Sequence, residues 1–310
     1  MPIAALQQKL KAEIAKTVFG QDAVIELALA GLFSGGHVLL EGMPGTAKTL
    51  LVRSLAAALA LKFSRVQMTP DLLPGDITGS SVYREDTREF VFLRGAVFGN
   101  FLLADELNRA SAKTQSALLE AMQELTVTAD GTTHPLPSPF MVFATQNPVE
   151  QEGTYPLPLA QLDRFMFRLK IGYPDAATEE RIYQTAPEAR QLADIQPVVS
   201  PAELSAARED IARTFVRAEV AAYVRQLLQA TRDDETLQTG GSPRAGLMLL
   251  AGAKGLARFA GRDFVTPDDI KECFLPALAH RVTLAASAEL EGLTAEDVLT
   301  RILNAVEVPR

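Results

Sequence analysis

Between residues 42 and 49 the chain reads Gly42-Met43-Pro44-Gly45-Thr46-Ala47-Lys48-Thr49. An apolar run, Val38-Leu39-Leu40, precedes this stretch, and an alanine- and leucine-rich segment from Leu50 to Leu61 follows it. A strand, a loop and a helix in this order are the context that a phosphate-binding loop requires. The backbone N–H groups of such a loop converge on phosphates, and the positive end of the helix dipole points at them.

The loop predicts how a nucleotide is held. Lys48 would reach the β- and γ-phosphates, and the Thr49 hydroxyl would ligate Mg²⁺. The residues from Gly42 to Leu50 are therefore the expected contacts of ATP. A glycine-rich turn that precedes Lys-Thr by chance is the alternative, and the flanking strand and helix disfavour it.

One position departs from the usual pattern, because Ala47 stands where a glycine usually precedes the lysine. Alanine adds only a methyl group and tolerates a helical start. We therefore expect the loop to survive this substitution.

Length and charge define the class of protein. The chain has 310 residues, enough for two domains with separate cores. Its net charge is -8, and 47% of its residues are hydrophobic, which is typical of globular proteins. Non-specific binding to nucleic acid depends on phosphate neutralisation by Lys and Arg, so an acidic chain does not favour it. No nucleic-acid partner is expected.

Cysteine, histidine and apolar patterns exclude other classes of site. The single Cys273 rules out an intrachain disulfide, fits a reducing compartment and is expected to be buried. His37, His134 and His280 have no metal-ligand spacing, so no zinc site is expected. No apolar stretch reaches the ~18 residues of a membrane span, and no N-terminal signal pattern is present. We expect a cytoplasmic protein without membrane insertion.

The first half of the chain alternates short apolar runs with helical segments, which predicts a parallel sheet with helices on both faces. The candidate strands are Val38–Leu40, Phe63–Gln67, Asn100–Ala104, Met141–Thr145 and Phe165–Leu169.

After residue 172 the strand signals stop, and Ala, Leu, Arg and Glu at helical spacing dominate. One helix start there is Thr266-Pro267-Asp268-Asp269, with an N-cap threonine, a proline at the first helical position and acids in the first turn. We expect an α/β nucleotide-binding domain over residues 1–172, a connection over residues 173–201 and a smaller all-helical domain over residues 202–310.

Two segments exceed a minimal α/β core. Between Asp71 and Gly95, two strand-like runs flank the polar tip Glu85-Asp86-Thr87-Arg88, which predicts an inserted β-hairpin. Between Thr126 and Phe140, Asp130-Gly131 is a strong signal for a second short hairpin. Both could be ordinary surface hairpins, although long excursions from compact domains are more often functional.

Two acids end the buried run that precedes residue 105. Ligands of parallel sheets bind at the carboxyl ends of strands, so Asp105 and Glu106 would emerge beside the phosphates. Asp105 is placed to hold Mg²⁺, and Glu106 is placed to orient the water that attacks the γ-phosphate.

Over nearly its whole length the chain resembles the MoxR family of AAA+ ATPases. The stretches that carry the resemblance are residues 69–79 (TPDLLPGDITG), 103–110 (LADELNRA), 114–122 (TQSALLEAM), 144–148 (ATQNP), 161–165 (QLDRF) and 242–245 (SPRA). The resemblance implies a phosphate-loop AAA+ core followed by an all-α lid domain. In that fold the hairpin after Asp71 is the helix-two insert, and the one after Thr126 precedes the sensor-one strand.

The resemblance also implies roles for further residues. Asn147, at a strand end beside the two acids, matches sensor one, which bonds the attacking water or the γ-phosphate; a turn-forming asparagine is the alternative. Arg164 matches the arginine finger, which reaches the γ-phosphate of a neighbouring subunit, unless it forms a surface pair with Asp163. Arg244 matches sensor two, acting from the lid of its own subunit. Phe19-Gly20-Gln21 resembles the segment that packs against adenine.

The implied function is that of an ATP-hydrolysing ring motor with an expected hexameric assembly. The family is associated with partners that carry von Willebrand factor A domains, and it acts in a chaperone-like way on client proteins. A metal-chelatase motor subunit, a nucleic-acid motor of a related clade and a non-hydrolysing nucleotide switch remain alternatives. A role for Arg109 stays open, because it could face the neighbouring nucleotide or the helix surface.

Overall fold

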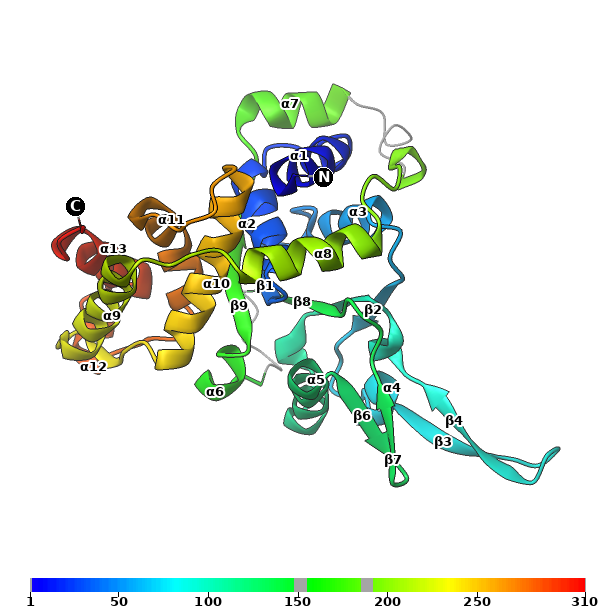
Figure 1. The fold of residues 1–310 in the computed structure, drawn as a ribbon. Helices are drawn as coiled ribbons and strands as arrows, with labels where there is room; N and C mark the ends of the chain where they lie inside the picture. Colours follow the sequence, from blue (N-terminus) through cyan, green and yellow to red (C-terminus); the bar gives the residue numbers. More distant parts are fainter. Residues whose placement is uncertain (1, 148–154, 185–191, 310) are drawn as a thin grey trace.

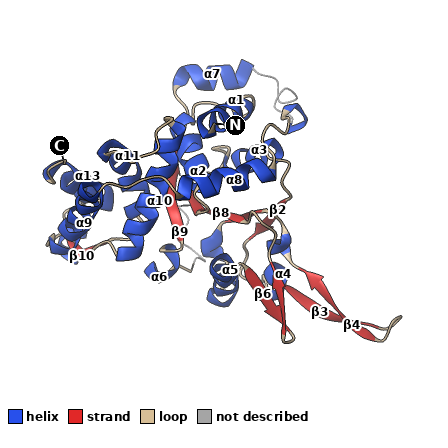
Figure 2. Ribbon diagram, in the orientation of Figure 1, coloured by secondary structure: helices blue, strands red, loops and turns tan. Residues whose placement is uncertain are grey.

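The computed structural model describes residues 2–147, 155–184 and 192–309. Its centre is a sheet of five parallel strands in the order β2-β5-β8-β1-β9. Figures 1 and 2 show strands of this sheet among the helices that cover it. The strands are β1 (His37–Gly42), β2 (Phe63–Gln67), β5 (Phe101–Asp105), β8 (Met141–Gln146) and β9 (Phe165–Ile171). All five strands were predicted, and their bounds differ from the prediction by a few residues at most.

Each face of the sheet buries its own core, because successive strand residues point to opposite faces. Val38 and Leu40 pack into one apolar cluster, while Leu39 between them packs into the other. Helices that precede β9 and helices that follow it in the chain both cover the first face. Those that precede it are α1 (Ile3–Ile14), α2 (Asp22–Phe33) and α3 (Lys48–Ala58). Helices α4 (Pro74–Thr78) and α5 (Ala112–Glu124) cover the second face, with the short 3₁₀ turns η1 (Ala96–Phe98) and η2 (Leu107–Arg109).

Two hairpins extend from the body of the molecule, as predicted (Figure 1). They are β3 (Gly79–Arg84) with β4 (Glu89–Arg94), and β6 (Thr126–Ala129) with β7 (Thr132–Pro135). Phe92 of the first hairpin stacks on His134 of the second, with ring centroids 4.1 Å apart. Phe92 also packs against the second apolar cluster, whereas Tyr83 and Phe90 of the same hairpin form an exposed aromatic pair.

The residues after β9 are mainly helical, and their elements are α7 (Ala176–Gln184), η4 (Leu192–Asp194), α8 (Pro201–Ala212), α9 (Ala218–Asp233), α10 (Pro243–Phe259), α11 (Pro267–Leu278), α12 (Ala286–Leu290) and α13 (Ala295–Ala305). Thr266 lies at the N-cap of α11 with Pro267 next to it, as predicted, and Asp269 Oδ2 accepts from both the Thr266 hydroxyl and the Thr266 N–H. Cys273 is buried, as predicted.

A short two-stranded sheet, β10 (Leu237–Thr239) with β11 (Thr283–Leu284), differs from the purely helical expectation. Its strands are too short to give a period-two signal in the sequence. The domain boundaries at residues 172 and 202 stay predictions, and residues 185–191 of the expected connection lie outside the described residues.

Helix α10 fixes the helical part against the edge strand β9. A Cβ atom built on Gly252 would lie 2.3 Å from the Phe167 ring, so the absent side chain lets the helix approach the strand. The Ser34 hydroxyl at the end of α2 also donates to the carbonyl of Ala251 at 2.8 Å. Among the described helices, none is both long and apolar enough to cross a bilayer.

Candidate active site

The loop predicted to hold phosphates joins β1 to α3. Gly45 has φ +83° and Ala47 has φ +66°, so both residues take left-handed backbone conformations. The reason given for the tolerance of alanine, a helical start, therefore does not apply, because Ala47 is left-handed and the helix begins one residue later, at Lys48. A left-handed non-glycine residue costs roughly 1–2 kcal/mol, which explains why glycine usually occupies this place. The loop is formed despite that strain.

Lys48 lies over the loop. Its ammonium group donates to the carbonyls of Gly42 at 2.7 Å and Met43 at 2.8 Å. Burial lowers the pKa of Lys48, and the charges of Asp105 and Glu106 oppose that shift. The first-turn N–H groups of α3 have no intrahelical acceptor. An anion at this point would meet both the free amides and the ammonium group.

The carboxyl ends of the strands form the other side of a cleft of about 440 Å³. The residues that line it are Pro44, Gly45, Thr46, Ala47, Lys48, Thr49, Leu50, Arg65, Gln67, Asp105, Glu106, Thr145, Gln146 and Asn147. The structure thus brings the predicted loop, both acids and Asn147, the predicted sensor-one residue, together. Asn147 is only 9% exposed, and its successor Pro148 lies outside the described residues.

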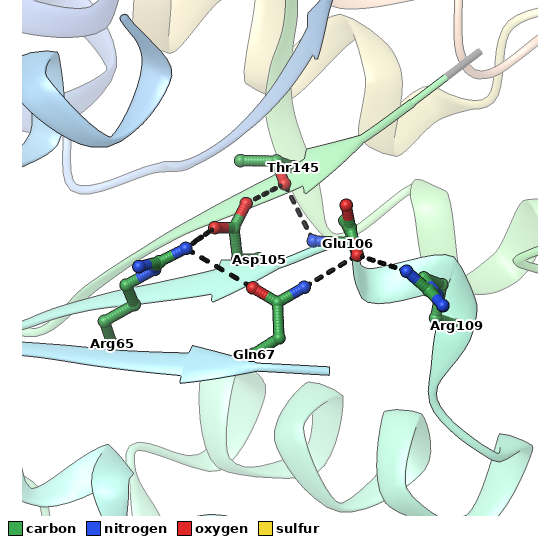
Figure 3. A network of polar contacts seen from close by, with 6 residues as sticks. All are labelled: Arg65, Gln67, Asp105, Glu106, Arg109 and Thr145. Atoms are coloured by element: carbon green, nitrogen blue, oxygen red, sulfur yellow. Dashed lines mark hydrogen bonds and ion pairs between the residues drawn. The ribbon is translucent and has the colours of Figure 1, made fainter. Parts of the chain in front are cut away.

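Both acids are held by hydrogen bonds from neighbouring strands (Figure 3). Asp105 Oδ2 accepts from the Arg65 guanidinium at 2.6 Å, and Asp105 Oδ1 accepts from the Thr145 hydroxyl at 2.6 Å. Glu106 Oε2 accepts from Gln67 Nε2 at 2.6 Å and from Arg109 Nη1 at 3.0 Å. Arg109, whose role was open, therefore contacts the acid of its own chain.

Three members of this network were not predicted from the sequence: Arg65, Gln67 and Thr145. Arg65 and Gln67 are two positions apart in β2, so their side chains point to the same face of the sheet. The strand register pairs Gln67 with Asp105. Thr145 is the first polar residue of the buried run that starts at Met141, and this was the available signal for it. Only the strand order shows that β2 and β8 flank β5.

The segment expected to contact adenine lies between α1 and α2, outside the residues that line the cleft. Gln21 Nε2 donates to the carbonyl of Gly172 at 3.1 Å, and Gly172 follows the strand paired with Gly42. The Arg181 guanidinium of α7 lies over the Phe19 ring, 4.5 Å from its centroid. Gly20 has φ +69°, and a Cβ atom built on it would lie 3.0 Å from the Thr178 side chain of α7. Any role of this segment in binding adenine stays a prediction.

Arg164 and Arg244 lie outside the cleft that contains the phosphate loop and the two acids. Arg164 directly precedes β9, so it lies at the amino end of the parallel sheet, whereas the loop lies at the carboxyl end of β1. Strand β1 has six residues, which separates the two ends by roughly 20 Å. Arg244 is 3.9 Å from Asp163, beside Arg164.

Both arginines line a second cavity of about 280 Å³, together with His37 at the start of β1. Arg244 was expected to contact the γ-phosphate of its own subunit, and its position at the amino end of the sheet contradicts that prediction. The cause is the close packing of α10 on β9, which carries the amino end of α10 to the amino edge of the sheet. Arg164 donates to the carbonyl of Leu119, and its Nε atom is buried without a hydrogen-bond partner among the described residues.

Comparisons with known proteins agree with this geometry. Residues 37–167 match the ATPase family associated with various cellular activities (AAA), and residues 229–302 match the AAA lid domain. Chaperone MoxR1 of Mycobacterium tuberculosis is 46% identical over 311 residues, covering 96% of this chain and 81% of the relative. The chain belongs to the MoxR family of AAA+ ATPases.

Two other similar proteins extend the comparison. Protein YeaC of Bacillus subtilis is 43% identical over 296 residues, covering 96% of this chain and 92% of the relative. A crystal structure from Cytophaga hutchinsonii, of a protein classed as an ATPase, superposes with a TM-score of 0.92 at 41% identity. It covers 99% of this chain and 96% of that one. The AAA+ core, the lid and ATPase activity are therefore properties of this MoxR-family chain.

Proposed function

We propose that this ATPase works as a ring, in which each ATP is held by one subunit and hydrolysed with help from the next. The observation that supports this proposal is the separation of the arginines from the loop. Lys48 and Arg164 lie at opposite ends of one parallel sheet, so a single subunit offers only part of a site. We take six subunits from the resemblance to ring-forming relatives.

The residues around the cleft fit a nucleoside triphosphate with Mg²⁺. The free amides of α3 and the Lys48 ammonium suit phosphate oxygens. The Thr49 hydroxyl and the Asp105 carboxylate supply the oxygen donors that Mg²⁺ prefers. When bound, Mg²⁺ neutralises charge on the phosphates. Glu106 orients and polarises the attacking water, and Asn147 holds that water or the γ-phosphate.

Arg164 and Arg244 complete the site from the neighbouring subunit. Both arginines line one cavity, so a subunit that docks there would bring its γ-phosphate towards two cations. A guanidinium supplied in trans stabilises charge on the phosphate oxygens and can raise the rate by ~10³–10⁵-fold. We retain Arg164 as the arginine finger and place Arg244 beside it in the same role, in trans.

The work performed by hydrolysis is proposed to be chaperone-like remodelling of partner proteins. The name of the Mycobacterium tuberculosis relative supports a chaperone function. The resemblance to the family favours partners with von Willebrand factor A domains, met in the cytoplasm. The exposed Tyr83 and Phe90 on the projecting hairpin give such a partner an apolar contact (Figure 1).

ATP turnover per chain, measured across a dilution series, tests the shared site. We expect turnover per chain to fall when the ring dissociates, and Arg164→Ala to abolish turnover while binding of ATP to the chain is retained. Lys48→Ala, by contrast, should lose binding. Turnover that stays constant on dilution into monomers would refute the proposal, as would full activity of Arg164→Ala.

A further inference from the structure

Thr145 lies between the two acids of the cleft. It belongs to the carboxyl end of β8, and the residue is only 1% exposed. Its hydroxyl oxygen is 2.6 Å from Asp105 Oδ1 and 2.8 Å from the backbone nitrogen of Glu106 (Figure 3). Both partners belong to the neighbouring strand end, so this hydroxyl joins β8 to β5 where β5 carries the acids.

The direction of each bond follows from the chemistry of the groups. The backbone N–H of Glu106 can only donate, so the Thr145 hydroxyl accepts from it. The single hydroxyl proton is then free to point at Asp105 Oδ1, which accepts it as a carboxylate. Hydrogen bonds to an ionised acceptor are short and strong, and the 2.6 Å separation agrees. The Thr145 hydroxyl therefore fixes the position of Asp105 Oδ1, and Asp105 Oδ2 faces Arg65.

The backbone of Glu106 requires such support. Glu106 has φ +57°, a left-handed conformation that a residue other than glycine rarely adopts. This turn ends β5 and starts the 3₁₀ turn that carries Arg109 back to the Glu106 carboxylate. Conformations of this kind persist when surrounding contacts hold them, and they are frequent at active sites. The bond from the Glu106 N–H to Thr145 is such a contact.

We propose that Thr145 is a positioning residue for ATP hydrolysis, whose hydroxyl group holds the Asp105 carboxylate and the Glu106 backbone in one fixed relation. The inference rests on the proposed roles of Asp105 in holding Mg²⁺ and of Glu106 in orienting water. Thr145 itself acts through these two residues. Without the hydroxyl, Asp105 would lose the partner of one oxygen and Glu106 would lose the partner of its N–H.

Thr145→Val tests the proposal, because valine keeps the shape and the β-branched side chain of threonine. Thr145→Ser should restore the bonds, since serine keeps the hydroxyl group. Thr231→Val is a matched control: Thr231 is also fully buried, donates to the Leu228 carbonyl at 2.6 Å and accepts from the Gly241 N–H at 2.8 Å, but it lies in α9. Each variant is compared with the unmodified chain in thermal unfolding.

Two measurements separate positioning from loss of stability. The first is the steady-state rate of ATP hydrolysis as a function of Mg²⁺ concentration. The second is the affinity for a nonhydrolysable ATP analogue, measured with Mg²⁺ and again with a chelator, which reports on Asp105 without any turnover. For Thr145→Val we expect kcat to fall by about tenfold or more and the gain in affinity from Mg²⁺ to shrink by a similar factor. Thr145→Ser and Thr231→Val should keep both values within about twofold.

A Thr145→Val chain with unchanged kcat and Mg²⁺ dependence would overturn the proposal. So would equal losses in Thr145→Val and Thr231→Val. Asp105→Asn and Glu106→Gln are measured in parallel. If these two leave Mg²⁺ dependence and turnover unaltered, the proposed function itself fails. If they act as expected while Thr145→Val behaves as the unmodified chain, only the role of Thr145 fails.

Discussion

Arg65 and Asp105 form an ion pair at the carboxyl ends of neighbouring strands. The Arg65 guanidinium donates to Asp105 Oδ2 from Nη2 at 2.6 Å and from Nε at 3.2 Å. Asp105 is mostly buried, whereas half of the Arg65 side chain is exposed. A cation of the chain itself thus contacts the oxygen that we expect to face Mg²⁺.

Removal of that guanidinium should make Mg²⁺ bind more readily. We expect Arg65→Ala to lower the Mg²⁺ concentration at half-maximal ATP turnover by up to about fivefold, because a half-exposed ion pair contributes at most about 1 kcal/mol. Arg65→Lys, which keeps the charge, should resemble the unmodified chain. Titration of turnover with Mg²⁺ measures the effect. A higher Mg²⁺ requirement in Arg65→Ala would show that Arg65 supports the site instead of competing for Asp105.

Glu106→Gln should separate binding from hydrolysis. The amide keeps the size of the side chain but removes the charge that polarises water, so turnover should fall by roughly 10²–10⁴-fold while ATP still binds. Glu120, on the exposed face of α5, provides the matched control Glu120→Gln. The rate of ATP hydrolysis and the affinity for ATP, both measured on the same preparation of each variant, test this prediction. If Glu106→Gln hydrolyses ATP as fast as the control, Glu106 does not orient the water.

The left-handed Ala47 predicts a stability effect. Ala47→Gly should preserve ATP binding and raise the free energy of unfolding by about 0–1 kcal/mol, because relief of strain exceeds the added freedom of the unfolded chain. Ala47→Val should lower it, since a β-branched residue is poorly tolerated at positive φ. Denaturant unfolding of the three chains tests this order. Greater stability of the valine chain than of the glycine chain would contradict it.

His37 predicts how stability depends on pH. Burial lowers the pKa of His37 to about 4, and its ring accepts from the Val142 N–H through Nδ1 at 3.0 Å. The unfolded chain, with a histidine pKa near 6.5, binds the proton more readily than the folded chain. The stabilisation from neutral His37 is therefore complete above pH 6.5 and is lost as the pH falls towards 4.

The loss amounts to at most about 3–4 kcal/mol for this group. Carboxylates also titrate at the acidic end, so the variant His37→Gln isolates the histidine contribution. The free energy of unfolding of His37→Gln should decline less steeply than that of the unmodified chain between pH 6.5 and 4. Identical slopes in the two chains would exclude His37 as a source of the pH dependence.

The sequence was informative where a short segment determines its own structure. The phosphate loop, the five strands and the turn at Asp130-Gly131 could be predicted, because apolar runs, glycine positions and strand ends are local patterns. The bounds of β2 agree residue for residue with the prediction.

Features that depend on the packing of distant segments could not be predicted from the sequence. The position of Arg244 is set by the approach of Gly252 to Phe167, which joins residues far apart in the chain. Likewise, Thr145 reaches Asp105 because β8 lies beside β5, and neither strand reveals this alone. The left-handed conformation of Ala47 could not be predicted from the residue type, because the path between β1 and α3 imposes its φ angle.

The shared site is tested most directly by mixing two inactive chains. Lys48→Ala lacks the ATP contact but keeps both arginines, whereas Arg164→Ala keeps the cleft. If arginines act in trans, random co-assembly at equal amounts completes about a quarter of the interfaces of a head-to-tail ring, and activity returns in that proportion. Arg164→Ala mixed with Arg244→Ala should stay far less active, because no interface then contains both guanidinium groups. Co-assembled Lys48→Ala and Arg164→Ala chains that remain inactive would contradict the account.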